Sequence, residues 1–128
     1  MAEKRRILVV DDEPDFCSIV QGQLEKEGFE VDVAYNGVEG LEKVHENPPD
    51  AIVLDVMMPE MDGYEVCKRL KADKKCVDIP VILLTAVASH VTSTRYTHRD
   101  GMATEADDYI AKPASAEQIS ESIKQLLG

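Results

Sequence analysis

The chain has 128 residues, 44% of them hydrophobic and 30% charged, which suits one domain (residues 1–128) that folds without disulfides or a structural metal. Its formal net charge of −11, from 14 Lys plus Arg against 25 Asp plus Glu, argues against direct contact with nucleic acid or an anionic membrane. No apolar run approaches the roughly 18–20 residues of a membrane span, and the run that begins at Ile7 ends at Asp11, so we expect neither a membrane span nor a signal peptide.

Apolar runs alternate with amphipathic stretches along the chain. Continuous apolar runs are typical of strands buried on both faces of a parallel sheet. The alternating run of Phe29, Val31 and Val33 is typical of an edge strand. Together these runs predict strands over residues 7–10, 29–33, 51–54, 81–84 and 109–111.

Helix signals stand between these strands. Pro14 suits the first turn of a helix capped by Asp12 or Glu13, and Gly28 ends that helix. Residues 88–102 are rich in Ser and Thr, and we expect a loop and then a helix there. The remaining signals are helix starts at Asn36-Gly37 and Asp62-Gly63, a break at Asn47-Pro48-Pro49, and a capping box of Ser115 with Gln118 before the apolar stripe Ile119, Ile123, Leu126 and Leu127.

The alternation of strands and helices predicts an α/β fold, with a five-stranded parallel sheet covered by helices on both faces. Ligands of such sheets bind at the carboxyl ends of the strands, where the strand order reverses. If the order is 2-1-3-4-5, the first and third strands flank that point. Asp11, Asp12 and Asp55 would then converge on one pocket.

This pocket would have the chemistry of a phosphoryl site. Three adjacent carboxylates need a compensating cation, and Mg²⁺ is the hard, oxygen-binding ion that fits them. Lys112 supplies a positive charge and Thr85 a hydroxyl donor at two further strand ends. A carboxylate can act as the nucleophile in phosphoryl transfer. Each residue alone has an ordinary interpretation as a cap, a turn or a solvated side chain, so the prediction depends on their coincidence.

Other polar and sulfur-containing residues carry no predicted chemistry. Asp62-Gly63 is interpreted as a turn. The three cysteines are an odd number without metal-type spacing, which favours reduced thiols in a cytoplasmic protein. The cysteines are Cys17, Cys67 and Cys76. We expect the histidines, His45, His90 and His98, at the surface. We expect the clustered methionines, Met57, Met58 and Met61, to pack in the interior.

In these features the sequence closely resembles the receiver domains of two-component response regulators, over nearly its whole length. The motifs that carry the resemblance are residues 7–13 (Ile-Leu-Val-Val-Asp-Asp-Glu), 54–59 (Leu-Asp-Val-Met-Met-Pro), 61–63 (Met-Asp-Gly), 80–86, 106–110 (Ala-Asp-Asp-Tyr-Ile) and 112–113 (Lys-Pro). The resemblance implies a flavodoxin-like (βα)5 fold. It also implies a signalling domain that catalyses only its own phosphorylation and dephosphorylation.

The resemblance further implies a role for each site residue. Asp55 would be the phosphorylated residue, and Lys112 would pair with the phosphoryl group. Thr85 and Tyr109 would form the switch that moves on activation. Mg²⁺ would be bound by Asp12 directly, by Asp11 through water, by Asp55, and by the backbone carbonyl of Met57. The Lys112-Pro113 bond would be cis.

The family also implies partners: a histidine kinase or histidine phosphotransfer protein as donor, and a downstream protein or an output domain as target. Two departures from the family pattern lie on a face that receivers use for docking or for homodimers, built from the expected 88–102 helix, the last strand and the last helix. The interval from Thr85 to Lys112 is longer than usual, with extra residues before Gly101, and Glu105 replaces a glycine. Met57 and Val87 stand where the family tunes hydrolysis; both are apolar, which predicts a long-lived phosphorylated form.

Two alternatives remain at this point. A Mg²⁺-dependent phosphohydrolase with an aspartyl-phosphate intermediate typically has a second Asp two residues after the nucleophile, where this chain has Met57. A flavin-binding domain needs a phosphate-binding loop rich in Ser, Thr and Gly after the first strand, where this chain has Asp-Asp-Glu-Pro. The sequence therefore favours the receiver over both.

Overall fold

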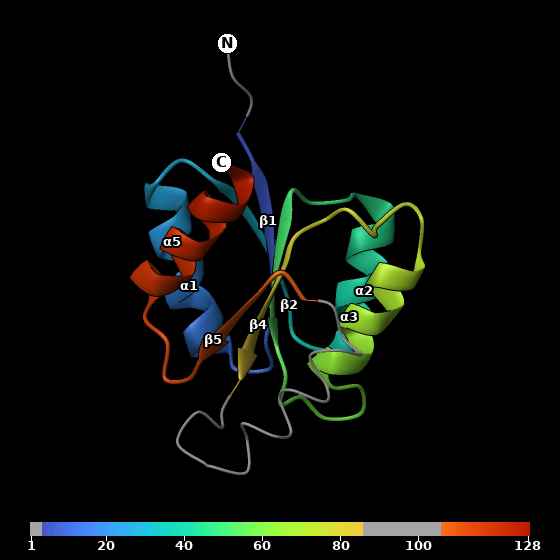
Figure 1. The fold of residues 1–128 in the computed structure, drawn as a ribbon. Helices are drawn as coiled ribbons and strands as arrows, with labels where there is room; N and C mark the ends of the chain where they lie inside the picture. The colour runs from blue at the N-terminus through green and yellow to red at the C-terminus, as the bar shows by residue number, and fades with distance from the viewer. Residues whose placement is uncertain (1–3, 86–105) are drawn as a thin grey trace.

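Five parallel strands form one sheet in the computed structural model, which describes residues 4–85 and 106–128. Their order is β2-β1-β3-β4-β5, which confirms the predicted topology. All neighbouring strands run parallel, so their carboxyl ends lie at one edge of the sheet, the lower edge in Figure 1. The strands are β1 (Arg6–Val10), β2 (Glu30–Ala34), β3 (Ala51–Asp55), β4 (Val81–Thr85) and β5 (Asp108–Ala111).

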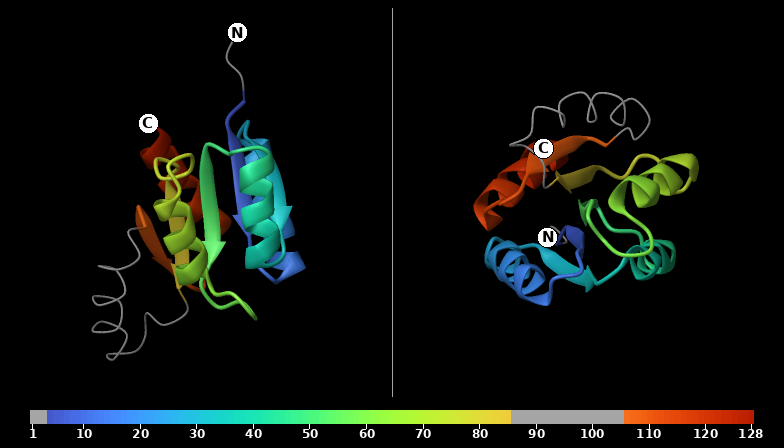
Figure 2. Two further views of the ribbon diagram at one scale, coloured as in Figure 1. Left: turned by 90° about the vertical axis from the view of Figure 1, so that its right-hand side faces the viewer. Right: turned by 90° about the horizontal axis from the view of Figure 1, so that it is seen from below.

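Helices cover both faces of this sheet. Figures 1 and 2 show α1 and α5 on one face, and α2 and α3 on the other. The helices are α1 (Pro14–Lys26), α2 (Gly37–Glu46), α3 (Gly63–Ala72) and α5 (Ala116–Leu127). No helix in the described ranges is long and apolar enough to cross a membrane. The segment 86–105, with its expected loop and helix, Val87, Gly101 and Glu105, lies outside the described residues.

Successive residues of the inner strands pack alternately into two separate hydrophobic cores. Leu8 and Val10 of β1 lie in the core under α2 and α3, whereas Ile7 and Val9 lie in the core under α1 and α5. Because side chains alternate between the faces of a strand, a strand covered on both faces must be apolar throughout. This burial on both faces explains why the inner strands appear in the sequence as continuous apolar runs. Leu126 and Leu127, which belong to the predicted buried stripe of α5, are partly buried and pack against the core under α1 and α5.

The helix starts follow the predicted signals with one difference. The side chains of Asn36, Asp62 and Ser115 each accept a hydrogen bond from a backbone N–H in the first turn of α2, α3 and α5. Glu13 is the N-cap residue of α1, but its side chain makes no cap hydrogen bond. Instead, the carboxylate of Asp11 accepts from the Glu13 N–H at 3.0 Å.

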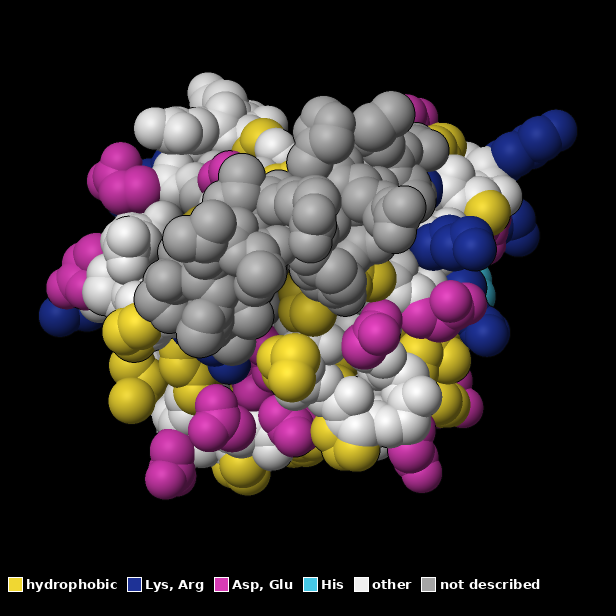
Figure 3. Space-filling model, turned by 60° about the horizontal axis from the view of Figure 1, so that its bottom comes forward, with side chains coloured by type: hydrophobic (Ala, Val, Ile, Leu, Met, Phe, Trp, Pro, Cys, Tyr) yellow, Lys and Arg dark blue, Asp and Glu magenta, His cyan; other side chains and the backbone are white. Residues whose placement is uncertain are grey.

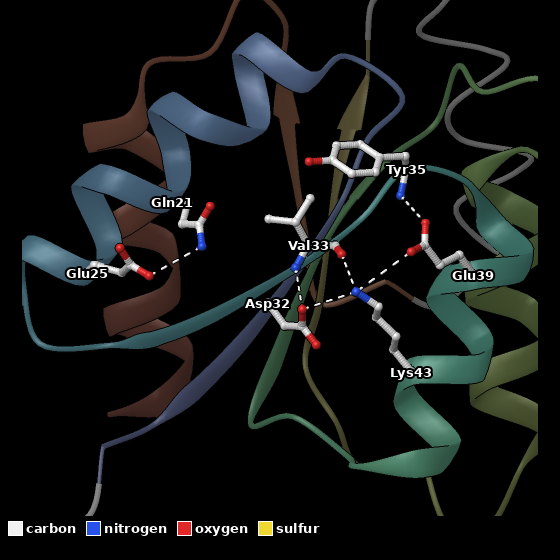
Figure 4. A network of polar contacts seen from close by, with 7 residues as sticks. All are labelled: Gln21, Glu25, Asp32, Val33, Tyr35, Glu39 and Lys43. Atoms are coloured by element: carbon white, nitrogen blue, oxygen red, sulfur yellow. Dashed lines mark hydrogen bonds and ion pairs between the residues drawn. The ribbon is translucent and has the colours of Figure 1, made fainter.

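A lysine from α2 binds the outer edge of the sheet, at strand β2 (Figure 4). Lys43 Nζ donates to the Val33 carbonyl oxygen at 2.6 Å and to Asp32 Oδ1 at 3.1 Å, and lies 3.7 Å from Glu39 Oε2. Glu39 in turn accepts from the Tyr35 N–H. An edge strand with unpaired backbone groups is a template for unwanted pairing, and a bound lysine obstructs it.

Candidate functional site

The residues that end the inner strands meet at the carboxyl edge of the sheet. Val10 of β1 pairs with Leu54 of β3, so Asp11 and Asp55 leave their strands side by side. Thr85 is the last residue of β4, and Lys112 directly follows β5. Figure 3 shows Asp and Glu side chains gathered with apolar ones on the described part of this end of the molecule. The predicted convergence is therefore present.

Three carboxylates form the centre of this cluster. One carboxylate oxygen from each of Asp11, Asp12 and Asp55 lies within 4.8 Å of the other two. Asp11 is fully buried and Asp55 is only 2% exposed, whereas Asp12 is exposed. Two buried carboxylates and one exposed carboxylate thus face one small volume, open to solvent on the side of Asp12.

One lysine is the cationic partner of these acids within the described part of the chain. Lys112 Nζ lies 3.2 Å from Asp11 Oδ2 and 3.3 Å from Asp55 Oδ1, with Glu13 Oε1 at 3.6 Å. The ammonium group also lies 4.9 Å from the centre of the Phe16 ring, a cation–π distance. The lysine is therefore held by several weak contacts that all place its charge beside Asp55.

Burial is the main cause that shifts the pKa values of the two buried acids. Burial and the nearby charge of Asp11 raise the pKa of Asp55 to about 6, and Lys112 only partly opposes this. Burial likewise raises the pKa of Asp11 against the Glu13 N–H and Lys112. For Lys112, burial alone would lower the pKa, but Asp11 and Asp55 outweigh it and the pKa is raised. The cluster therefore carries more negative charge than one lysine neutralises.

This donor set suits a hard divalent cation. Mg²⁺ prefers oxygen ligands and is usually held by one or two carboxylates with several waters. The three carboxylates supply such oxygens, and the raised pKa values of the two buried acids mark an unmet demand for positive charge. The residues present fit the ion that the sequence predicts.

The remaining predicted residues lie around the cluster. Thr85 is 8% exposed, and its carbonyl oxygen accepts from the Lys112 N–H, which ties β4 to the lysine. Tyr109, on β5, pairs with Leu83 of β4 and packs against the core under α2 and α3. Met57 donates its N–H to Asp55 Oδ1 at 3.4 Å. The residue is 64% exposed, which contradicts the expectation that it packs, whereas Met58 is buried as expected. The Lys112-Pro113 bond is cis, as the resemblance implies.

Sequence reasoning missed the positional role of Gly63. A Cβ atom at this position would lie 2.4 Å from the Asp55 carbonyl oxygen and 2.9 Å from the Val56 Cα atom. The Gly63 N–H also donates to the Val56 carbonyl oxygen at 3.0 Å. The start of α3 thus rests directly on the backbone that presents Asp55. The Asp-Gly pair was visible in the sequence, but only as a turn.

A protein-family model matches almost the whole chain. The model described as the response regulator receiver domain matches residues 7–124. Among curated relatives, the alkaline phosphatase synthesis transcriptional regulatory protein PhoP of Bacillus subtilis is 39% identical over 123 residues, which are 96% of this chain and 48% of that protein. The chain spans about half the length of the curated relatives it matches.

Solved structures share the fold. The receiver domain of a signal transduction histidine kinase from Syntrophus aciditrophicus is 36% identical with a TM-score of 0.84, covering 96% of this chain and 89% of that one. The chemotaxis response regulator CheY4 of Vibrio cholerae is 27% identical with a TM-score of 0.86, covering 97% and 99%. The similarity in fold therefore covers almost the whole chain.

Proposed function

This chain belongs to the response regulator receiver domain family, and it is a signalling domain rather than a conventional enzyme. On this premise we propose that Asp55 accepts a phosphoryl group from a phosphohistidine donor. The observation that carries the proposal is the position of the Asp55 carboxylate. It is buried at the end of β3, within 4.8 Å of two further carboxylates and 3.3 Å from Lys112 Nζ. Receiver membership also argues against the phosphohydrolase and flavin alternatives.

The proposed reaction is a transfer between two side chains. An oxygen of Asp55 forms a bond to phosphorus while the bond between phosphorus and the donor imidazole nitrogen breaks, and the bonding electron pair leaves with the imidazole. Proteins assist phosphoryl transfer chiefly by positioning and by neutralising charge. Lys112 lies where its ammonium group would bind a phosphoryl oxygen on Asp55, and the Thr85 hydroxyl lies at the neighbouring strand end.

Mg²⁺ would be held by Asp12, by Asp11 through water, by Asp55, and by the Met57 carbonyl oxygen. When bound, it supplies the positive charge that brings an anionic phosphoryl group to a cluster of carboxylates. Burial raises the pKa of Asp11 and Asp55, and Asp11 adds repulsion at Asp55; these shifts support the assignment because a bound cation would favour the ionised form of both acids. The Glu13 N–H bond to Asp11 orients that carboxylate toward the cluster.

The switch proposed for this domain consists of Thr85 and Tyr109. A phosphoryl group on Asp55 would draw the Thr85 hydroxyl toward it, and Tyr109 would follow into the space that is left. Thr85 is held between β3 and β5, through the pairing of Asp55 with Leu84 and of Thr85 with Ala111. A shift at Thr85 would therefore be felt at β5 and α5, the proposed surface for a partner or a homodimer.

We assign residues 1–128 to one receiver domain, with a histidine kinase or histidine phosphotransfer protein as its donor. Three curated relatives are about twice as long, and all three are named as transcriptional regulators, one of them as a probable one. This chain would accordingly control a downstream protein or an output domain, without direct contact with nucleic acid or membrane. A cytoplasmic location is proposed because all three cysteines are free and buried.

The proposal is tested by intact mass spectrometry after incubation with Mg²⁺ and acetyl phosphate. We expect a gain of one phosphoryl mass that requires Mg²⁺, disappears in Asp55→Asn and is strongly reduced in Lys112→Ala. Far-UV circular dichroism establishes that each variant is folded. A folded wild-type protein that gains no mass, or an Asp55→Asn variant that gains it equally, would contradict the proposal.

A further inference from the structure

A second cluster of potential ligands lies at the opposite end of the sheet from Asp55. His45 is in the last turn of α2, Asp73 is the C-cap residue of α3, and Cys76 is in the turn that follows. These segments precede the amino ends of β3 and β4, whereas Asp55 is at the carboxyl end of β3 (Figure 1). One imidazole nitrogen, one carboxylate oxygen and the thiol sulfur all lie within 4.8 Å of one another.

The carboxylate of Asp73 is already oriented toward the other two residues. Its Oδ1 atom accepts from the Lys75 N–H at 2.9 Å, which leaves Oδ2 directed at His45 Nε2 at 3.1 Å. The backbone carbonyl of Asp73 also accepts from the N–H groups of Cys76 and Val77. This turn therefore fixes the relative positions of Asp73 and Cys76 before any ligand binds.

The thiol of Cys76 lies at the boundary between the core and an open pocket. Cys76 is 1% exposed and belongs to the core under α2 and α3. The same residue lines a pocket together with Val44, His45, Pro48, Asp73 and Lys75. The His45 side chain is 55% exposed at the mouth of this pocket. A small ion can thus approach from solvent and meet a sulfur ligand with a rigid position.

From this arrangement we propose that His45, Asp73 and Cys76 form a Zn²⁺ site, with solvent as the fourth ligand. A thiolate, an imidazole and a carboxylate are the ligand types that Zn²⁺ accepts in tetrahedral geometry. A hard ion such as Mg²⁺ would not select a thiolate. Typical zinc–ligand bonds place tetrahedral donor atoms about 3.3–3.7 Å apart. The His45 and Asp73 atoms, at 3.1 Å, are already this close, so the remaining separations, none above 4.8 Å, need to close by about 1 Å, which the exposed His45 side chain can provide.

The charges of the site are consistent with this ion. The Lys75 N–H, and then His45, hold the pKa of Asp73 below its usual value, so this ligand is ionised at neutral pH. Burial and the charge of Asp73 raise the pKa of Cys76, so the free site holds a neutral thiol. Binding of the metal would release that proton, since the thiolate is the ligand form. Zn²⁺ with one carboxylate and one thiolate is neutral overall.

Zn²⁺ bound here would join the end of α2 to the turn between α3 and β4. These two helices pack against each other, and the described part of the chain offers no disulfide to link them. A ligand that binds only the folded state stabilises it by mass action. The site would therefore act as a metal-dependent clasp on the helix pair, separate from phosphorylation at Asp55.

The test is a titration of the reduced, metal-free chain with Co²⁺, in excess Mg²⁺, followed by displacement with Zn²⁺. A bound thiolate gives a sulfur-to-cobalt charge-transfer band in the near ultraviolet, and four-coordination gives intense visible bands. We expect both at one Co²⁺ per chain, and their loss on addition of Zn²⁺. Carboxylates alone produce no charge-transfer band. Cys17 lies beside the cluster around Asp55, so variants of the two cysteines must separate its thiol from that of Cys76.

Matched variants assign the signal to its residues. Cys76→Ser should abolish the charge-transfer band. His45→Gln should weaken binding by at least the roughly 10–100-fold that loss of even an outer-shell partner costs. Cys17→Ser should retain the band because Cys17 is buried on the opposite face of the sheet, beside Asp11.

Three outcomes would overturn the proposal. They are the absence of a charge-transfer band at several-fold excess of metal, a band that survives Cys76→Ser but not Cys17→Ser, and unchanged affinity in a folded His45→Gln variant.

Discussion

Gly63 lies so close to Asp55 that a Cβ atom on the glycine would come within 2.4 Å of the Asp55 carbonyl oxygen. Real Cβ atoms do not tolerate such a distance, so any other residue at position 63 must displace one of the two backbones. The backbone that would move is the one that presents the proposed phosphorylated carboxylate. This contact makes the first turn of α3 part of the construction of the site.

Gly63→Ala should therefore impair both stability and phosphorylation. We expect a loss on the order of 1–3 kcal/mol in the free energy of unfolding, the usual cost of overpacking. Phosphorylation by acetyl phosphate should slow at least several-fold. Urea unfolding and intact mass spectrometry measure the two effects.

Gly22→Ala is the matched control for this substitution. Gly22 is inside α1, and a Cβ atom there would meet nothing within 4 Å. Alanine is the better helix former, so this variant should gain about 0.5–1 kcal/mol. Equal behaviour of the two variants would contradict the contact argument.

Asp55→Asn should stabilise the metal-free protein at neutral and alkaline pH. Burial raises the pKa of Asp55 from 3.8 to about 6, so between these values the folded protein holds a proton that the unfolded chain has lost. Stability then falls as the pH rises through this window, and the loss is complete above about pH 6. Asparagine removes the buried charge, and we expect a gain on the order of 1–3 kcal/mol.

The measurement is urea unfolding in EDTA, at about pH 8 and at about pH 4. The difference in free energy of unfolding between Asp55→Asn and wild type should shrink at the lower pH, where the wild-type carboxyl is protonated. Mg²⁺ should also reduce it, by binding only the wild type tightly. A variant that is less stable than wild type at pH 8 would exclude a raised pKa at Asp55.

Met57→Asn should shorten the lifetime of phosphorylated Asp55. Met57 is 64% exposed, and its backbone nitrogen lies 3.4 Å from Asp55 Oδ1. A thioether is a poor hydrogen-bonding group, whereas an amide can donate to and accept from an attacking water. We expect decay to be several-fold faster, followed by intact mass after removal of acetyl phosphate.

Val38→Asn is the control, since Val38 is an exposed apolar residue on α2. It should leave the decay rate unchanged. The Val87→Glu change that completes the prediction from the sequence can be combined with Met57→Asn. No acceleration in either the single or the double variant would refute the prediction of a lifetime set by these two apolar residues.

Glu27→Gln should reduce stability at neutral pH but not in acid. Glu27 accepts hydrogen bonds from Lys124, Ser120 and Gln23, and these bonds lower its pKa from 4.5 to about 2. A carboxylate with a depressed pKa stabilises the fold above its unfolded pKa, and the contribution is lost as the pH falls from about 4.5 to about 2. Since solvent screens this cluster, we expect a loss of about 1 kcal/mol at pH 7.

Glu25→Gln serves as the comparison. Glu25 is in the last turn of α1, of which Glu27 is the C-cap residue, and its side chain accepts a hydrogen bond from Gln21 (Figure 4). Its removal should change stability little. Chemical unfolding of both variants at about pH 7 and about pH 3 separates the two cases. If Glu27→Gln lowers the free energy of unfolding as much in acid as at neutral pH, then packing rather than charge is responsible for the stabilisation by Glu27.

The sequence by itself determined which segments form the inner strands and which polar residues end them, and so the candidate site. Inner strands covered on both faces must be apolar throughout, so their extent was visible as runs, and the residue that ends each run had to lie at the carboxyl edge of the sheet. Asp11, Asp55, Thr85 and Lys112 could therefore be predicted without coordinates. The capping box at Ser115 was equally local and equally visible.

Only the tertiary structure decided what depends on distances between remote residues. Lys112 is 101 positions from Asp11 along the chain, yet 3.2 Å from it in space, and this proximity together with burial sets the pKa of the acids. The contact of Gly63 with Asp55 and the cluster of His45 with Cys76 have the same origin. Periodicity and caps report the environment of one segment, whereas these contacts arise when separate segments pack at the two ends of the sheet.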